Sequence, residues 1–412
     1  MAAHKEFKLI TSTDDAFRKY APIVEVIEEG EVKITEWDIP FTIKELSYLT
    51  HSHYRYYGKF PSVLAGKIID NIARPSGEHY ILDNFCGSGT TLVEAELRGV
   101  KSYGVDINWI SVLASNVKVR HLNINEVKRA LSTIISMYEQ DRTNHTLIAA
   151  PFTDKWFEPQ ATTALTALSN YIFEWDKGAV RDFLLIAFIG IVRRVSKAFD
   201  GEVRPHINKE KKPREVLSAF SKKVLDMCSS HAEYMSITKN SHHSNCLLSN
   251  NITLPDQFND KKCYLVISHP PYLNSFNYTP VFSLELFWGK RFEHEYTDNI
   301  SLYKDEMRAH PANETITDEY FRHLEKCYLE TFRIQEPGAY LAIVIGDCTR
   351  NGELVPVLDK TIELVERIGY KLTEINYRTT HYGLGKYAYS HRADYHGDEK
   401  GKKDGVIVFR KP

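Results

Sequence analysis

The sequence predicts an α/β fold with a mostly parallel sheet, and three apolar segments carry this prediction. Residues 81–83 lead into a glycine turn and a helix start, and residues 102–107 form a second strand that contains Asp106. Residues 262–268 read as a buried strand that stops just before the double proline Pro270 and Pro271. Because α/β sheets bind ligands at the carboxyl ends of their parallel strands, these strand ends are expected to share one site.

The turn after the first strand contains Gly87 and Gly89, which lack Cβ atoms and so permit a sharp turn and a close approach to a ligand. Thr90 and Thr91 follow and can accept hydrogen bonds from the first amides of the next helix. An ordinary turn or a nicotinamide-binding turn would look similar, since a short glycine motif carries little weight alone. Leu92 replaces the third glycine of G-x-G-x-x-G, which disfavours a phosphate-binding loop.

The segment after the glycine turn predicts a helix and a second strand. Val93 and Leu97 share one helical face, and Gly99 supplies a stop signal. Asp106 follows Asp83 by 23 residues. This is close to the roughly 20-residue spacing at which such folds place an acid against ribose hydroxyls. A nucleoside-containing ligand is therefore expected at this edge.

The double proline cannot continue a central strand, so the chain is expected to leave the sheet rigidly at that point. A turn signal at Pro337 and Gly338 precedes a later strand. Residues 121–240 are expected to be mostly helical. Strands are expected before and after the double proline, at residues 246–248 and 339–345, and a helix at residues 355–368. The two last strands, at residues 371–377 and 405–410, could pair antiparallel.

Several segments resemble motifs of the S-adenosylmethionine-dependent amino-methyltransferases of DNA, which methylate cytosine N4 or adenine N6. Asp83-Asn-Phe-Cys-Gly-Ser-Gly-Thr-Thr91 is similar to the cofactor motif Asp-Pro-Phe-x-Gly-Ser-Gly-Thr-Thr, and Ser268-His-Pro-Pro-Tyr272 is similar to the catalytic Ser/Asp/Asn-Pro-Pro-Tyr. Segments at residues 60–64 and 248–255 resemble two further cofactor-binding segments. The resemblance covers most of the chain. It implies a Rossmann-like class I methyltransferase fold, with a seven-stranded, mostly parallel sheet, a reversed last strand and a helical insertion.

The resemblance implies roles for individual residues. The cofactor-binding positions are Phe60, Pro61, Asp83, Phe85, Gly87, Ser88, Gly89, Thr90, Asp106 and Asn250. The catalytic positions are His269, Pro270, Pro271 and Tyr272. Asn250 stands where the family has an Asp against adenine, and its amide can still form hydrogen bonds. The implied chemistry is direct transfer of a methyl group from the cofactor's sulfonium to an exocyclic amine of a flipped base, without a metal or a covalent intermediate.

His269 is the main departure from the family pattern, because most such enzymes have Asp, Asn or Ser directly before Pro-Pro-Tyr. The usual inference of the target base from this residue is lost. A neutral imidazole can accept a hydrogen bond from the target amine, whereas an imidazolium cannot. Activity is therefore expected to fall as the pH drops through the imidazole pKa, normally about 6.5 unless burial moves it.

Residues 193–223 hold ten basic and four acidic residues, although the net charge of the whole chain is only −2. A solvated loop between helices is one explanation. Phosphate contact suits a base-modifying enzyme better, because Lys and Arg supply the salt-dependent part of DNA affinity. The expected DNA-binding residues are Arg204, Lys209, Lys211, Lys212 and Arg214.

The composition indicates a cytoplasmic protein. The six cysteines have no C-x-x-C spacing and mostly occupy apolar segments, which is typical of reduced thiols in a cytosolic protein. The strongest apolar run, residues 183–192, is shorter than the roughly 20 residues that cross a bilayer. We expect this run to be a buried helix and expect no membrane partner.

The expected organisation is an amino-terminal segment or lid at residues 1–58, a catalytic core at 59–120 and 241–412, and a helical, candidate DNA-recognition insertion at 121–240. Residues 50–57, rich in aromatic and imidazole side chains, suit base stacking and a packed lid equally. Residues 379–403 form a long loop. Its three histidines fit stacking on nucleic acid better than metal binding: His381, His391 and His396.

The expected function is S-adenosylmethionine-dependent methylation of DNA at an exocyclic amine, with cytosine N4 favoured over adenine N6. DNA is the expected partner, and a cognate restriction endonuclease is a further candidate. Two alternatives stay open. One is an RNA base N-methyltransferase, because guanine-N2 enzymes of transfer RNA share the glycine loop and a Pro-Pro-Tyr. The other is a cofactor-binding but inactive homologue in which His269 marks the loss of catalysis.

Overall fold

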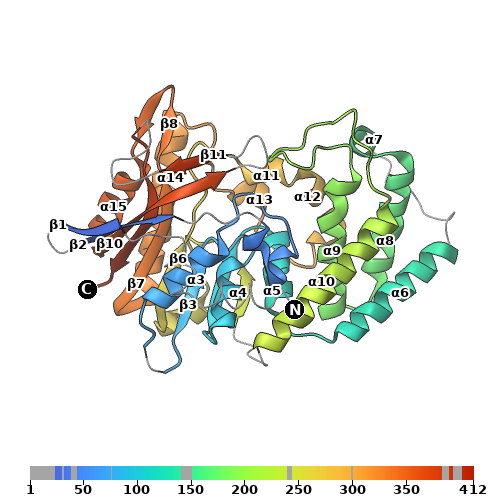
Figure 1. Cartoon of the computed structure of the whole chain (residues 1–412), viewed down its shortest axis with the longest axis horizontal. Coiled ribbons are helices and arrows are strands. Elements are labelled where there is room, and N and C mark those ends of the chain that lie inside the picture. The colour runs from blue at the N-terminus through green and yellow to red at the C-terminus, as the bar shows by residue number, and fades with distance from the viewer. Residues whose placement is uncertain are drawn as a thin grey trace.

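The computed structural model describes residues 24–29, 32–38, 44–75, 77–140, 151–238, 244–297, 300–382, 389–392 and 401–412. A large twisted sheet with helices on both faces lies beside a lobe made of helices (Figure 1). The order of the main path through the sheet is β1-β2-β10-β12-β7-β6-β3-β4-β5, and β11 pairs with β10.

The strands of the sheet are β1 Val24–Glu29, β2 Val32–Asp38, β3 Tyr80–Asp83, β4 Ser102–Asp106, β5 Ser244–Leu248, β6 Cys263–Ser268, β7 Gln335–Gly346, β10 Lys371–Tyr382, β11 Tyr389–Arg392 and β12 Asp404–Arg410. A separate hairpin pairs β8 Cys348–Arg350 with β9 Glu353–Val355.

The α-helices are α3 Ser62–Asn71, α4 Thr90–Leu97, α5 Trp109–Val119, α6 Ile124–Gln140, α7 Pro151–Trp156, α8 Pro159–Glu174, α9 Ala179–Val195, α10 Val216–Thr238, α11 Tyr278–Val281, α12 Ser283–Glu293, α13 Leu302–Asp305, α14 Glu314–Ile334 and α15 Val357–Ile368. Short 3-10 helices cover Glu45–Ser47, Leu49–Ser52 and Asp256–Asp260.

The strand directions confirm the predicted sheet and its reversed last strand. Strands β5, β4, β3, β6 and β7 are parallel. Strand β12 lies between β7 and β10 and runs antiparallel to both. The expected seven strands are therefore present, but the sheet is larger than predicted: β2 extends it in parallel beside β10, and β1 and β11 pair at that end. The added strands satisfy backbone groups that an exposed β10 edge would leave unpaired.

The central strands carry apolar residues on both faces of the sheet, as expected of a parallel sheet that helices cover on both sides. Ile81 and Ile267 pack in the cluster that contains α3. Leu82 and Val266 pack in the cluster that contains α14 and α15. This two-sided burial explains why the strands read as continuous apolar runs in the sequence.

The start of β7 differs from the expectation. The strand begins at Gln335, directly after α14, and not after a turn at Pro337 and Gly338. Pairing with β6 jumps from Gln335 opposite Cys263 to Tyr340 opposite Leu265. The proline and glycine therefore lie in a register irregularity inside the strand, where a missing amide donor and a positive φ are tolerated.

The helical lobe has a core of its own, built from α5, α6, α8, α9, α10 and α12. Helix α9 contains the apolar run at residues 183–192 and is buried, as predicted. Helix α12 follows β6 in the chain, so the lobe also draws on residues beyond the 121–240 region. His51, His53 and Tyr54 are buried, which favours packing over base stacking for this segment.

All six cysteines are free and buried. Among the helices that the structure describes, none combines the length and the apolar character that crossing a bilayer demands.

Gly89 provides a test of the packing under the glycine turn. It has φ +74°, and a Cβ atom there would lie 2.9 Å from the Cα of Ser115 on α5. Gly99 has φ +63° but no atom within 4 Å of such a Cβ. We expect Gly89→Ala to lower the free energy of unfolding by about 3 kcal/mol or more, and Gly99→Ala by about 1 kcal/mol, because only the first adds a backbone clash to the strain. Equal losses in urea denaturation would contradict the close packing of Gly89 on α5.

Candidate active site

A pocket lies where the carboxyl ends of β3, β4 and β6 meet the segment after β5. It encloses about 830 Å³ of empty space, its open mouth included. The predicted site residues that line it are Phe60, Asp83, Phe85, Gly87, Ser88, Thr90, Asp106, Asn250, His269 and Pro271.

Four of the predicted catalytic and cofactor-binding residues do not line this pocket. Pro61 precedes α3 in an extended conformation, and Gly89 lies under the turn against α5. Pro270 is buried at the end of β6. Tyr272 lies beside the pocket, where its ring contacts His269 edge to face with 5.6 Å between the centroids. The predicted catalytic segment thus borders the predicted cofactor segment.

Asp83 holds the glycine turn in shape. Its Oδ1 accepts from the backbone N–H of Phe85 at 3.1 Å, and its Oδ2 accepts from the hydroxyl of Thr91 at 2.5 Å. Burial raises the pKa of this carboxyl to about 6, although both hydrogen bonds oppose the shift. On the other side of the turn, the buried Lys118 donates to the carbonyl oxygen of Ser88. The turn is therefore fixed before any ligand arrives.

Asp106 joins the end of β4 to the same turn. One carboxylate oxygen accepts from the backbone N–H of Gly87 and the other from that of Asn108, both at 2.8 Å. Burial raises the pKa of Asp106 to about 7, against the lowering effect of these two hydrogen bonds. An acidic side chain at this place fits the hydroxyl groups of a nucleoside, which would donate to the ionised form.

The aromatic wall of the pocket could not be assigned from the sequence. Tyr56 and Tyr278 stack with 5.5 Å between ring centroids and both line the pocket. A Cβ atom on Gly87 would lie 3.1 Å from the Tyr56 ring, so the glycine is required for this approach. The aromatic density of residues 50–57 was the available signal, but it did not distinguish Tyr56 from its buried neighbours.

Two more lining segments have no sequence motif. Glu306 accepts from the backbone N–H and hydroxyl of Thr279 and so fixes the residues 302–307 against α11. His323 of α14 contacts the side chain of Asn251 at 3.0 Å, and Asn251 donates to the carbonyl of Asn84. These contacts join residues far apart in the chain, and local patterns do not report such contacts.

His269 is half-buried and stacks on Phe60, with 5.1 Å between the ring centroids and 25° between the planes. Burial and the positive charge of Arg378 lower the pKa of His269 to about 3. The imidazole is therefore neutral at physiological pH and able to accept a hydrogen bond. The pH window expected from an ordinary histidine, near 6.5, moves to strongly acid pH.

The backbone around His269 is held on two sides. The hydroxyl of Tyr320 donates to the carbonyl of Pro271 at 2.9 Å. The hydroxyls of Ser268 and Tyr328 lie 3.3 Å apart. Both tyrosines belong to α14, so this helix holds the Pro-Pro segment in place.

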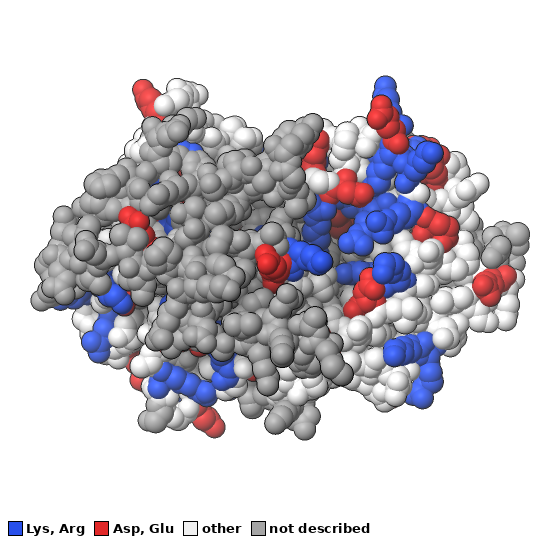
Figure 2. Space-filling view, in the orientation of Figure 1, with Lys and Arg blue, Asp and Glu red and all other residues white. Residues whose placement is uncertain are grey.

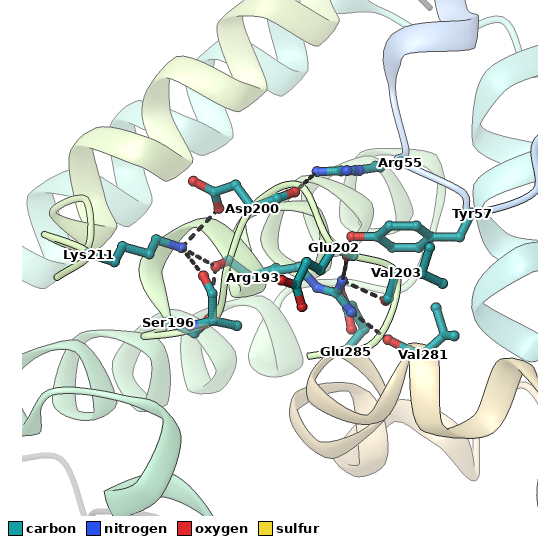
Figure 3. A network of polar contacts seen from close by, with 11 residues as sticks. Arg55, Tyr57, Arg193, Ser196, Asp200, Glu202, Val203, Lys211, Val281 and Glu285 are labelled. Carbon is teal, nitrogen blue, oxygen red and sulfur yellow. Dashed lines mark hydrogen bonds and ion pairs between the residues drawn. The ribbon is translucent and has the colours of Figure 1, made fainter. Parts of the chain in front are cut away.

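The basic stretch covers the end of α9, the loop at residues 196–215 and the start of α10, and buried polar contacts anchor the loop (Figure 3). The buried Arg193 donates to the hydroxyl of Tyr57 and to the carbonyls of Glu202 and Val203, and it pairs with Glu285 at 3.5 Å. Because Tyr57 lies next to the pocket residues Tyr56 and Gly58, the network connects this loop to the pocket wall.

Lys211 is an exception among the expected DNA-binding residues. Its ammonium group donates to the carbonyls of Arg193 and Ala198 and to the carboxylate of Asp200, at 2.7–3.0 Å. Lys211 therefore holds the loop and is withdrawn from the expected phosphate contacts. The other four residues are exposed: Arg204, Lys209, Lys212 and Arg214. Figure 2 shows Lys and Arg side chains on the helical lobe, with acidic side chains among them.

Within the described residues, no group of three or more His, Cys, Asp and Glu side chains is arranged to hold a metal ion. The expected loop at residues 379–403 is wrong in part, because residues 379–382 of β10 pair antiparallel with β11 at residues 389–392. The side chains of His381, His391 and His396 lie outside the described part, so the interpretation of these histidines stays a prediction.

Parts of this chain are similar to known proteins. Residues 10–116 match a family model described as DNA methylase. The type II methyltransferase M.MvaI of Kocuria varians is 27% identical over 55% of this chain, and the match spans about half (54%) of that protein. M.BsoBI of Geobacillus stearothermophilus is 24% identical over 87% of both chains. The structure of a SAM-dependent methyltransferase from Methanosarcina mazei is 10% identical, with 84% of this chain and 96% of that chain covered and a TM-score of 0.32.

The parallel sheet with one reversed strand and a ligand pocket at its carboxyl edge defines a Rossmann-like class I methyltransferase fold. Within that class, the matched family model and the type II methyltransferase relatives agree with the DNA amino-methyltransferases. The family match confirms the resemblance found in the sequence and, with it, the expected cofactor. The pocket suits this cofactor, because it offers a glycine turn, a carboxylate and aromatic walls.

Asp106 predicts a pH dependence of cofactor affinity. Ribose hydroxyls would donate to the ionised carboxylate and stabilise it, so binding requires loss of a proton whose pKa is about 7 in the free protein. Affinity for S-adenosylmethionine should be full above pH 7 and fall as the pH drops below it, by at most about tenfold per pH unit. Calorimetric titration from pH 5.5 to 8.5 measures this. Asp106→Asn should bind weakly and lose the step near pH 7, and an unchanged step would exclude Asp106 as its source.

Proposed function

We propose that this protein transfers a methyl group from S-adenosylmethionine to an exocyclic amine in DNA, cytosine N4 rather than adenine N6. The observation that carries the proposal is that Gly87 of the glycine turn and His269 and Pro271 of the catalytic segment line the same pocket. The similarity to type II methyltransferases supports DNA as the substrate and, as a further proposal, a cognate restriction endonuclease in the same cytoplasm.

In this proposal the cofactor lies across the carboxyl ends of β3 and β4. The carboxylate of Asp106 receives the ribose hydroxyls, and the side-chain amide of Asn250 meets the adenine ring. The glycine turn borders the cofactor from Asp83 to Thr90, and Phe60 closes over its methionine end. When bound, S-adenosylmethionine supplies a sulfonium methyl group that a neutral amine can attack.

The flipped base would rest against the ring of Tyr272, and the carbonyl of Pro270 and the imidazole of His269 would hold its amine. With a pKa of about 3, His269 is a weak base. Its contribution is to accept a hydrogen bond and aim the nitrogen lone pair at the methyl group. Catalysis then depends on positioning, since the amine loses its proton only as the new bond forms.

The function is tested by incubating the protein with S-adenosylmethionine and mixed-sequence DNA, followed by mass spectrometry of the nucleosides. We expect N4-methylcytosine. N6-methyladenine would retain the amino-methyltransferase and correct the base. Methylation of RNA alone, or no product despite cofactor binding, would overturn the proposal in favour of an RNA enzyme or an inactive homologue.

His269 predicts a rate that is insensitive to pH over a wide range. Because its pKa is lowered to about 3, the imidazole stays neutral down to roughly pH 4. Single-turnover rates under saturating cofactor and DNA should therefore not fall between pH 8 and pH 6. His269→Ala should lose at least about a hundredfold in rate, and His269→Asn should retain more because its amide oxygen can accept the same bond. A His269→Ala variant as fast as the wild type would remove this residue from the mechanism.

The exposed part of the basic loop is proposed to contact DNA phosphates. Replacing Lys209 and Lys212 by Ala should weaken DNA binding and lower the slope of log affinity against log salt by about 0.9 for each phosphate that the loop no longer neutralises. Lys128→Ala with Arg129→Ala on α6 removes two exposed charges from the same lobe and serves as the matched control. Cofactor affinity should stay the same in both variants. An equal salt slope in the two variants would mean that the loop makes no phosphate contact.

A further inference from the structure

Tyr272 is held by a buried ion pair that comes from the last part of the chain. A guanidinium nitrogen of Arg378 on β10 donates to the Tyr272 hydroxyl at 2.5 Å. The same guanidinium pairs with the carboxylate of Asp404 on β12, and this carboxylate lies 3.4 Å from the Tyr272 hydroxyl. Arg378 is 5% exposed and Asp404 is 8% exposed. The phenol hydroxyl therefore meets a buried ion pair.

The reversed strand is what brings Asp404 to this place. Because β12 runs antiparallel to β7, its first residue pairs with the last residue of β7, Gly346. A parallel β12 would present its other end at the pocket edge. The fold feature that defines the class thus delivers a carboxylate to the side of the sheet where the Pro-Pro-Tyr segment lies.

Gly346 shows how closely the parts fit. A Cβ atom there would lie 2.8 Å from an oxygen of Asp404 and 3.0 Å from the ring of Tyr272. Both distances are too short for an ordinary contact, so this end of β7 accommodates the ring and the carboxylate only because it has no side chain. The ring is confined at its edge as well as at its hydroxyl.

A buried ion pair is a weak source of stability, because the loss of hydration of both charges offsets their attraction. A well-packed apolar pair between β10 and β12 would serve the sheet equally well. The hydroxyl of Tyr272 receives its hydrogen bond from a charged donor, and such bonds are stronger and more directional than neutral ones. This arrangement suits the fixing of a ring orientation better than the pairing of two strands.

We propose that Arg378 and Asp404 are positioning residues that set the orientation of the Tyr272 ring, and thereby of the face on which the target base rests. The inference depends on the proposed function, because a base must occupy that face. Arg378 has no direct part in the methyl transfer. Its charge also lowers the pKa of His269, but the imidazole is neutral at pH 8 with or without this effect. At pH 8 the effect of Arg378 on the rate therefore passes through the phenol hydroxyl, and removal of that hydroxyl should reproduce its loss.

The test uses Tyr272→Phe, which keeps the ring and removes the hydroxyl. Its single-turnover rate should fall at least about tenfold, the equivalent of one hydrogen bond to a charged group, with unchanged affinity for S-adenosylmethionine. Tyr370→Phe is the matched control, since its hydroxyl donates in a buried hydrogen bond to Gln335 away from the pocket. That variant should lose stability but keep the wild-type rate.

The coupling between the two residues is measured with Arg378→Met alone and combined with Tyr272→Phe. If Arg378 acts through the hydroxyl, Arg378→Met slows the wild type but slows Tyr272→Phe no further. Arg378→Lys should recover part of the rate. Should Arg378→Met fail to fold, Tyr272→Phe against Tyr370→Phe still decides the matter.

This inference would be overturned if Tyr272→Phe had the wild-type rate. It would also be overturned if Arg378→Met slowed the wild type and Tyr272→Phe by the same factor. The proposed function would stand in both cases. A wild-type protein that methylates no DNA would overturn both. Weaker cofactor binding in Tyr272→Phe would show that the socket supports the cofactor site and not the base, and this result also contradicts the proposal.

Discussion

The hydrogen bond from the backbone of Gly87 to the carboxylate of Asp106 is the contact on which the pocket depends. It joins the turn after β3 to the end of β4, in addition to the hydrogen bonds by which Asp83 and Lys118 hold the turn. Parallel strands bring their carboxyl ends together, so β6 delivers His269 to the same edge. The pocket follows from strand direction and from one glycine turn that the Asp106 carboxylate holds in place.

Burial in this pocket has opposite consequences for acids and bases, because it disfavours the charged form of each. It raises the pKa of Asp106 to about 7 and, together with Arg378, lowers that of His269 to about 3. The carboxyl of Asp106 can lose its proton when a ligand hydroxyl donates to it, and the imidazole of His269 remains a neutral hydrogen-bond acceptor. A histidine can therefore stand where the family usually has Asp, Asn or Ser without bringing a positive charge to the amine.

The sequence predicted those parts of the site that local chemistry encodes. Glycines in a turn and a double proline after a strand have backbone requirements that are visible in a few residues, and Gly87 and His269 were found in this way. Tyr278, Glu306 and Arg378 could not be found, because their roles come from contacts with residues far along the chain. Lys211 was assigned to DNA on charge alone, and only the fold shows its ammonium group bonded within its own loop.

The central claim is that the pocket at the carboxyl ends of β3 and β4 binds S-adenosylmethionine. Ultraviolet cross-linking of cofactor labelled in its methyl group, followed by peptide mapping, tests it most directly. The label should appear on peptides that contain Tyr56, Gly87 or His269, and excess unlabelled cofactor should abolish it. Label found instead on peptides around the second cavity, which Trp37 and Tyr340 line on another part of the sheet, would contradict the account.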